Sequence, residues 1–164
     1  MLSVGRNSRR GITLLEMLVV VAIVGVIAGV SFPSISAGLE SVRMVAATDS
    51  VATFLNSGVN RAERRQQAVA LSVDPKDNML SLFSSDAGYE KHLKLPEGVT
   101  IEAILPADGA GETRQERRFL FLPGATVPAI GIQLTNTHGA HRLVQVDPMT
   151  GFPRVKSIDP QAAQ

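Results

Sequence analysis

An apolar segment near the amino terminus constrains this chain more than any other feature. Between Ile12 and Phe32 the only polar side chains are Thr13, Glu16 and Ser31. As an α-helix this segment would be about 30 Å long, close to the hydrocarbon thickness of a bilayer. Its apolar side chains would lie on every side, so such a helix must be surrounded by lipid or by other apolar helices.

Charge and composition limit the orientation and the chemistry of the chain. Residues 1–11 contain Arg6, Arg9 and Arg10 and no acidic residue, although the whole chain has a formal net charge of only +1. Basic residues ahead of an apolar span predict a cytoplasmic amino terminus and an exported carboxy-terminal domain. The near-neutral total argues against a nucleic acid as the main partner. The lack of cysteine excludes a disulfide scaffold, a thiol nucleophile and a cysteine-ligated metal.

Three interpretations of the apolar segment are open: a plain membrane anchor, a cleaved secretory signal peptide, and a leader cut just before the apolar run. Glu16 favours the third, because a carboxylate in an apolar helix costs up to about 3 kcal/mol and no lysine or arginine lies in the helix. Cleavage after Gly11 would create an α-amino group at Ile12, one helical turn from Glu16. When such helices pack side by side, the amine of one can meet the carboxylate of the next and set their register.

The residues around this position resemble a known signal. The string from Arg9 to Met17, RRGITLLEM, resembles the leader of type IV pilins and of type II secretion pseudopilins. The resemblance implies cleavage after Gly11 by a prepilin peptidase and N-methylation of Ile12, although the usual first mature residue is phenylalanine. It also implies assembly roles for Glu16 and Pro33, which fall where the family carries its glutamate and often its helix-bending proline.

The helix is expected to continue beyond the apolar segment. Pro33 lacks a backbone N–H, which predicts a kink or a local melt there. After it, apolar residues recur every three or four positions, so an amphipathic helix is expected as far as about Gln67. We therefore divide the chain into a cleaved leader (1–11), a membrane or filament-core helix (12–33), an amphipathic second half (34–67) and a globular domain (68–164).

From Ala68 onward the apolar period changes to two, which predicts strands. Turn sequences separate them, and residues 106–116 are polar and form a long loop. The expected fold class is α+β, with a long amino-terminal helix packed on one face of an antiparallel sheet. The expected strands are Val69–Val73, Met79–Phe83, Val99–Ile104, Arg118–Leu122, Ala129–Thr135, Arg142–Val146 and Arg154–Ile158.

Short motifs in this domain resemble minor pseudopilin H (GspH) and the FimT and FimU minor pilins. Pro123 stands where the family usually has an acidic residue, which puts that turn in doubt. The motifs that carry the resemblance are Leu95–Ile101, Phe119–Gly124, Gly131–Leu134, Arg142–Val146 and Thr150-Gly151.

The resemblance implies the pilin fold and a minor pseudopilin of the type II secretion system, a structural subunit of the periplasmic pseudopilus that drives export of folded proteins across the outer membrane. The implied partners are prepilin peptidase, other pseudopilins or pilins in a helical filament, and an inner-membrane assembly platform. The implied location is the bacterial inner membrane, crossed once. The alternative is a minor pilin that primes type IV pilus assembly or contributes to DNA uptake.

No catalytic constellation is evident, so neither an enzyme nor a cofactor is expected. His138 and His141 flank a predicted hairpin and could share a metal, but surface histidines explain them better, and no metal site is predicted. Arg114, Arg117 and Arg118 form a basic edge that could touch nucleic acid. A strand edge protected by charge is the favoured interpretation of these arginines.

Overall fold

The computed structural model describes residues 12–84, 88–106 and 115–158, apart from the side chains of residues 30–37. The chain divides into two compact units, of which the first ends at Gly38 and the second begins at Leu39. The predicted leader, including Gly11, lies outside the described residues, as do residues 107–114 of the long loop.

Helix α1 (Leu14–Arg65) has a defined start and a defined end. The Glu16 amide donates to the Thr13 hydroxyl at 3.2 Å, so Thr13 is the N-cap. At the other end, Gln66 has a φ of 53° and the Gln67 amide donates to the Ala62 carbonyl at 3.2 Å. This left-handed cap is the Schellman arrangement, and it ends the helix two residues before the predicted limit.

Helix α1 is continuous through Pro33, so the local melt, one of the two outcomes predicted there, does not occur. Position 33 still has helical backbone geometry, and its side chain is outside the described set. In the described ranges, no helix combines the length and the apolar character that crossing a membrane requires.

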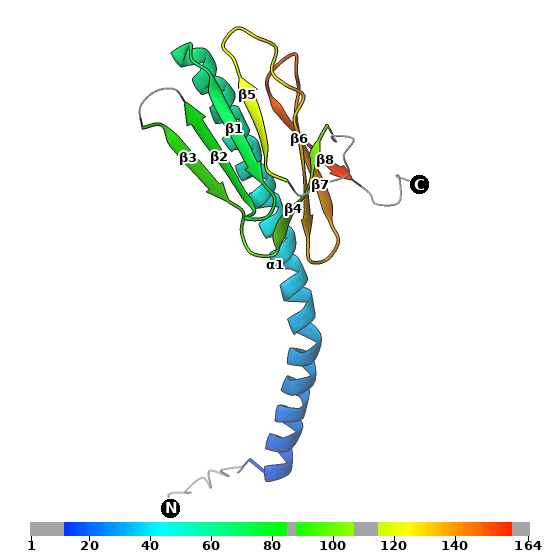
Figure 1. Ribbon diagram of the computed structural model, residues 1–164. Helices are drawn as coiled ribbons and strands as arrows, with labels where there is room; N and C mark the ends of the chain where they lie inside the picture. The colour runs from blue at the N-terminus through cyan, green and yellow to red at the C-terminus, as the bar shows by residue number, and fades with distance from the viewer. Residues whose placement is uncertain (1–11, 85–87, 107–114, 159–164) are drawn as a thin grey trace, which may run out of the picture. The chain divides into compact units, whose positions relative to one another are not determined.

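The second unit contains the carboxy-terminal half of α1 and two four-stranded antiparallel sheets, so the α+β prediction is confirmed (Figure 1). The first sheet has the order β3-β2-β1-β5 and the second β4-β6-β7-β8. This division replaces the single sheet that the sequence suggested. The strands are β1 (Val69–Asp74), β2 (Met79–Ser84), β3 (Glu90–Lys94), β4 (Val99–Leu105), β5 (Arg117–Phe121), β6 (Gly131–Asn136), β7 (His141–Val146) and β8 (Pro153–Ile158).

Strand β3 was not predicted from the sequence. Its residues, EKHLK, are mostly charged, and only Leu93 packs against the core. It pairs with β2 at the edge of the first sheet, where charged side chains are favoured because they discourage further pairing.

The turn after β1 connects the two sheets. The Asp74 carboxylate accepts the Lys76 amide at 2.8 Å, and the Asn78 side-chain oxygen accepts the Ile101 amide of β4 at 3.0 Å. These oxygens therefore build the turn and join it to the second sheet.

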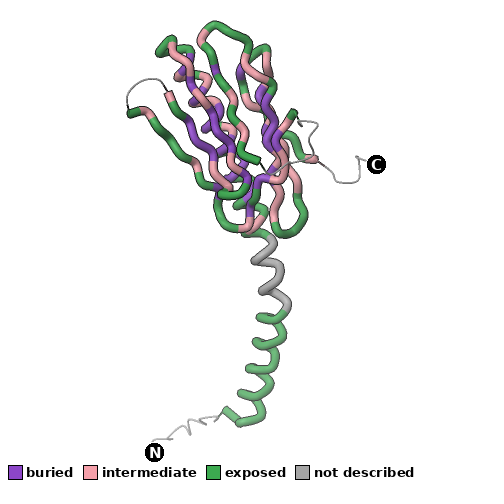
Figure 2. Tube along the Cα trace, in the orientation of Figure 1, coloured by how far each residue is buried: buried purple, intermediate pink, exposed green. Residues whose placement is uncertain are grey.

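One hydrophobic core lies between α1 and the two sheets of the second unit. Figure 2 shows the buried residues gathered on these elements. Met44, Val51 and Leu55 supply the helix side, and each is at most 2% exposed. The strands supply most of the remainder, including Leu71, Leu80, Leu82, Phe121, Ile132, Leu134 and Val144.

Gly58 allows the first sheet to approach α1 closely. A Cβ atom at this position would lie 2.8 Å from Leu82 Cδ2 and 3.0 Å from the Phe121 ring. Those distances are shorter than normal contacts, so only glycine fits without movement of the core. At Gly38, by contrast, a Cβ atom would meet nothing within 4 Å.

We predict that Gly58→Ala lowers the free energy of unfolding of the second unit by about 1 kcal/mol. Overpacking typically costs about 1–3 kcal/mol, and the higher helix propensity of alanine offsets about 1 kcal/mol of it. Urea unfolding of the full chain in detergent micelles measures the change. The matched control Gly38→Ala should cause no loss, and equal stability of the two variants would contradict the packing argument.

Candidate assembly sites

The amino-terminal part of α1 exposes a large apolar surface. Every described side chain from Ile12 to Gly29 is exposed, and Leu14 reaches 84%. Soluble proteins rarely expose so many neighbouring apolar side chains, because contact between apolar surface and water is unfavourable. The first unit therefore has a surface suited to contact with lipid or with other helices.

Glu16 lies at the head of this surface with its carboxylate available. Its backbone amide is bound by Thr13, and the spacing Thr-Leu-Leu-Glu is that of a capping box. Among the described residues, no hydrogen bond or ion pair of the Glu16 carboxylate is found. Ile12 lies four residues before Glu16 in the sequence, but the helix begins at Leu14 and not at Ile12 as expected, because Thr13 caps it. Glu16 is therefore placed to help the helix begin and to meet a cation from outside the chain.

The basic edge proposed as a nucleic-acid contact is engaged in contacts within the chain, and those of Arg117 reach the end of β4 in the second sheet. Arg117 donates to the carbonyl of Ile104 at 3.1 Å and to that of Pro106, and it lies over the Phe119 ring. Arg118 pairs with Glu116 at 3.2 Å. Arg114 lies outside the described residues, and contact of this edge with DNA stays a prediction.

The Glu116 carboxylate connects this edge to the neighbouring strand. It accepts the Ser72 hydroxyl of β1 at 2.6 Å. That hydrogen bond first, and then Arg118, lower the pKa of Glu116 below its usual value. The contacts are those of a strand edge stabilised by charge, the interpretation favoured from the sequence.

The histidines of the predicted hairpin have different partners. His141 contacts Glu102 at 2.6 Å, whereas His138 contacts Glu40 on α1. Among the described residues, no group of three or more histidine, cysteine or acidic side chains is placed to hold a metal ion.

A serine, a histidine and a glutamate also lie in line across β2 and β3. His92 bonds to Ser81 through Nδ1 at 2.8 Å and to Glu90 through Nε2 at 2.9 Å. Ser81 is only 5% exposed, so a substrate would not reach its hydroxyl. The contacts hold the edge strand to its neighbour.

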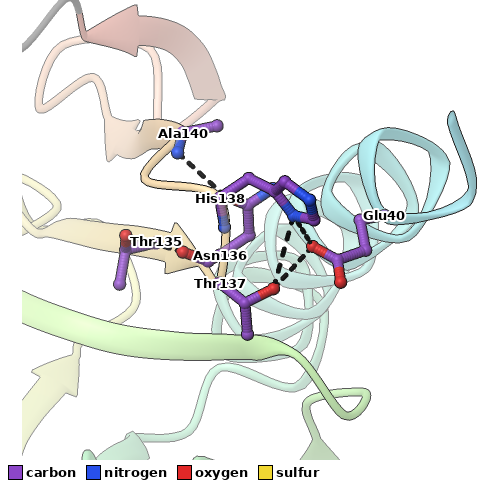
Figure 3. Close-up of polar contacts among 6 residues, drawn as sticks. All are labelled: Glu40, Thr135, Asn136, Thr137, His138 and Ala140. Carbon is purple, nitrogen blue, oxygen red and sulfur yellow. Dashed lines mark hydrogen bonds and ion pairs between the residues drawn. The ribbon is translucent and has the colours of Figure 1, made fainter. Parts of the chain in front are cut away.

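A polar cluster joins the β6–β7 turn to the helix, as Figure 3 shows. Asn136 shapes the turn, because its side-chain oxygen accepts the amides of His138 at 3.1 Å and Ala140 at 2.8 Å. The turn then presents two side chains to Glu40: the Thr137 hydroxyl, which donates at 2.6 Å, and the His138 ring. The cluster anchors the hairpin to the part of α1 where the second unit begins.

These contacts shift the titration of Glu40. The Thr137 hydroxyl makes the largest contribution and lowers the pKa of the Glu40 carboxyl; partial burial opposes this, and His138 and Arg43 lower it further. Sequence reasoning found the turn but not its partner, because Glu40 lies far away in the sequence and no local pattern connects the two.

Comparisons with known proteins agree with this architecture. Residues 6–32 match the prokaryotic N-terminal methylation motif, which includes the predicted cleavage site and Glu16. The structure is similar to that of the minor pseudopilin EpsH from the type 2 secretion system of Vibrio cholerae, with a TM-score of 0.50 and 13% sequence identity over 70% of this chain and 95% of that one. A comparison with curated proteins found no match.

Together these findings define the class. The chain carries a prepilin-type methylation motif ahead of a domain with a pilin-like fold. Within that class, its fold is similar to that of a minor pseudopilin, as the sequence motifs indicated.

We predict that the Glu40 cluster stabilises the second unit in a pH-dependent way. Because the pKa of Glu40 is lowered in the folded chain, its stabilising effect is present above the pKa of the unfolded chain and is lost as pH falls through the folded-state pKa. The melting temperature of the native chain should therefore exceed that of Glu40→Gln at neutral pH, and the difference should shrink below about pH 4.

Thermal unfolding across this pH range measures the effect. Thr137→Val, which removes the main donor, should behave as Glu40→Gln does. The matched control Glu97→Gln, in the turn before β4, should not change the melting temperature. A difference between native chain and Glu40→Gln that is the same at all pH values would contradict the interpretation.

Proposed function

We propose that this protein is a minor pseudopilin of the type II secretion system, a non-enzymatic subunit of the periplasmic pseudopilus that drives export of folded proteins across the outer membrane. The observation that carries the proposal is the presence, in one chain, of the methylation motif over residues 6–32 and a fold similar to a minor pseudopilin. Neither the exposed apolar helix nor the free Glu16 carboxylate has a use in an isolated soluble domain.

Biogenesis begins with a precursor in the inner membrane. The arginines of residues 1–11 hold the amino terminus in the cytoplasm, and the apolar sequence from Ile12 to Phe32 inserts behind them. Prepilin peptidase then cuts after Gly11, and the new terminus at Ile12 is methylated. The cut leaves Thr13 in place, so the N-cap of α1 survives processing.

Assembly places the amino-terminal helices of several subunits side by side. The exposed apolar side chains between Ile12 and Gly29 contact neighbouring helices of other pseudopilins in the filament. The Glu16 carboxylate meets the terminal amine of an adjacent subunit, and this pair fixes the axial register because it is formed where water is scarce. The inner-membrane assembly platform supplies the subunits, and the second unit faces the periplasm.

We predict that mature protein from its native host begins at Ile12 and carries one methyl group on the terminal nitrogen. Intact mass and amino-terminal sequencing measure this. Gly11→Leu should leave the full precursor, because a bulky side chain blocks the peptidase. A mature Ile12 terminus on that variant would contradict the assigned cleavage site.

We predict that the charge of Glu16, and not its capping role, is needed for assembly. Glutamine serves in a capping box as glutamate does, but it has no charge. Glu16→Gln and Glu16→Ala should both insert in the membrane, and both should enter filaments at least about tenfold less than native chain, since breaking a desolvated charge pair costs several kcal/mol. Quantitative immunoblotting of sheared filaments measures this.

Two comparisons make this test specific. The control Glu97→Gln should enter filaments normally. Normal incorporation of Glu16→Gln together with failure of Glu16→Ala would show that capping is the function of Glu16.

A deletion distinguishes the proposed function from its alternative. Deletion of the gene for this chain should stop protein secretion. Loss of surface pili with secretion intact would identify the alternative, a type IV minor pilin.

A further inference from the structure

The second unit contains a groove of about 590 Å³ that the filament role does not use. Its walls come from three segments that are distant in sequence: Val59 and Glu63 of α1, residues 124–127 of the β5–β6 connection, and residues 148–151 between β7 and β8. A groove of this volume can hold several side chains of a peptide.

The β5–β6 connection leaves main-chain groups free along this groove. Residues 126–130 belong to neither helix nor strand, and Thr126 is exposed. Within the described part of the chain, no hydrogen bond is found to the backbone of Thr126 or Val127. Unpaired, accessible backbone groups are the feature that an extended peptide uses when it binds through its own main chain.

The groove also has an apolar lining. Gly151 lies close to Val59 and Val127, since a Cβ atom there would be 3.3 and 3.4 Å from their methyl groups. A side chain at this position would therefore crowd both valines, which are partly buried and line the groove. These methyl groups can contact apolar side chains of a bound peptide.

Met149 adds an exposed apolar side chain on a turn that is held firmly. It is 94% exposed. The turn is fixed by hydrogen bonds from the Met149 amide to the Asp147 carboxylate at 2.9 Å and from the Gly151 amide to the Asp147 carbonyl at 2.8 Å. Methionine is enriched in protein interfaces, and a turn that is already ordered loses little entropy on binding.

Glu63 gives the groove its charge. It is the charged side chain among the described residues that line the groove. Its Oε1 accepts the Gly124 amide at 3.1 Å, which holds the carboxylate on the wall. A cationic side chain is therefore the complementary group for an occupant.

We propose that this groove binds an extended peptide segment of a partner protein in which a lysine or arginine lies between apolar residues. The peptide main chain pairs with the backbone of Thr126 and Val127. Its apolar side chains contact Val59, Val127 and Met149, and its cation pairs with Glu63. The groove lies within the second unit, so this inference is independent of the assembly role of the amino-terminal helix.

A short capped peptide of alternating threonine and valine with a central lysine tests the proposal on the full chain in detergent micelles. The peptide should slow amide hydrogen exchange at Thr126 and Val127. Glu63→Gln should weaken its binding about two- to fivefold, since glutamine still accepts the Gly124 amide and only the charge is lost. A peptide with central glutamate should bind weaker than the lysine peptide by a similar factor.

The matched control Glu97→Gln should leave the affinity for the lysine peptide unchanged. The proposal is overturned if the peptide does not slow exchange at Thr126 and Val127, or if it binds Glu63→Gln as tightly as the native chain. It is also overturned if these amides are already protected without peptide because a second copy of the chain occupies the groove.

Discussion

A carboxylate at the head of an apolar helix is unfavourable unless a cation meets it, and this constraint underlies the account of the whole chain. No lysine or arginine occurs between Ile12 and Val42, so the helix itself contains no cation that could meet Glu16. The proposed cut after Gly11 creates one at Ile12. The apolar side chains next to Glu16 are exposed in the single chain, so the part of the helix that needs a cation is also suited to contact with neighbouring helices.

The second unit has its own core and does not depend on that pair. Gly58 brings the first sheet close to α1, and the Glu40 cluster ties the β6–β7 hairpin to the same helix. Under the proposed function, this core would keep the domain folded while the amino-terminal helix passes from lipid into the filament. The groove at Glu63 then gives this domain a surface of its own for a partner.

Local patterns in the sequence predicted much of this fold. The 3–4 spacing of apolar residues predicted the helix beyond Pro33, and the period of two predicted most strands. Strand β3 was missed because its side chains face water on the sheet edge and carry no apolar alternation. The division into two sheets was missed because it depends on β5 pairing with β1, which are far apart in sequence.

The candidate sites divide in the same way: local sequence patterns predicted some of them, and contacts between distant segments form the others. Glu16 was identified because the residues that indicate its role lie close to it in the sequence. The partners of Glu40 and Glu63 lie in the turn 136–139 and at Gly124, which only the folded chain brings near them. Contacts between distant segments produce no periodic pattern in a single sequence. The Glu40 cluster and the groove at Glu63 could therefore be identified only in the folded structure.

The pairing of Glu16 with the terminal amine of a neighbour can be tested by a distance between two subunits. Filaments would be assembled from a mixture of subunits labelled at the terminal nitrogen of Ile12 and subunits labelled in the Glu16 carboxyl, and examined by solid-state nuclear magnetic resonance. A pair between Ile12 and Glu16 of adjacent subunits predicts magnetisation transfer between differently labelled subunits, as expected for a charge pair within about 4 Å. Well-ordered mixed filaments that show no such transfer would contradict it.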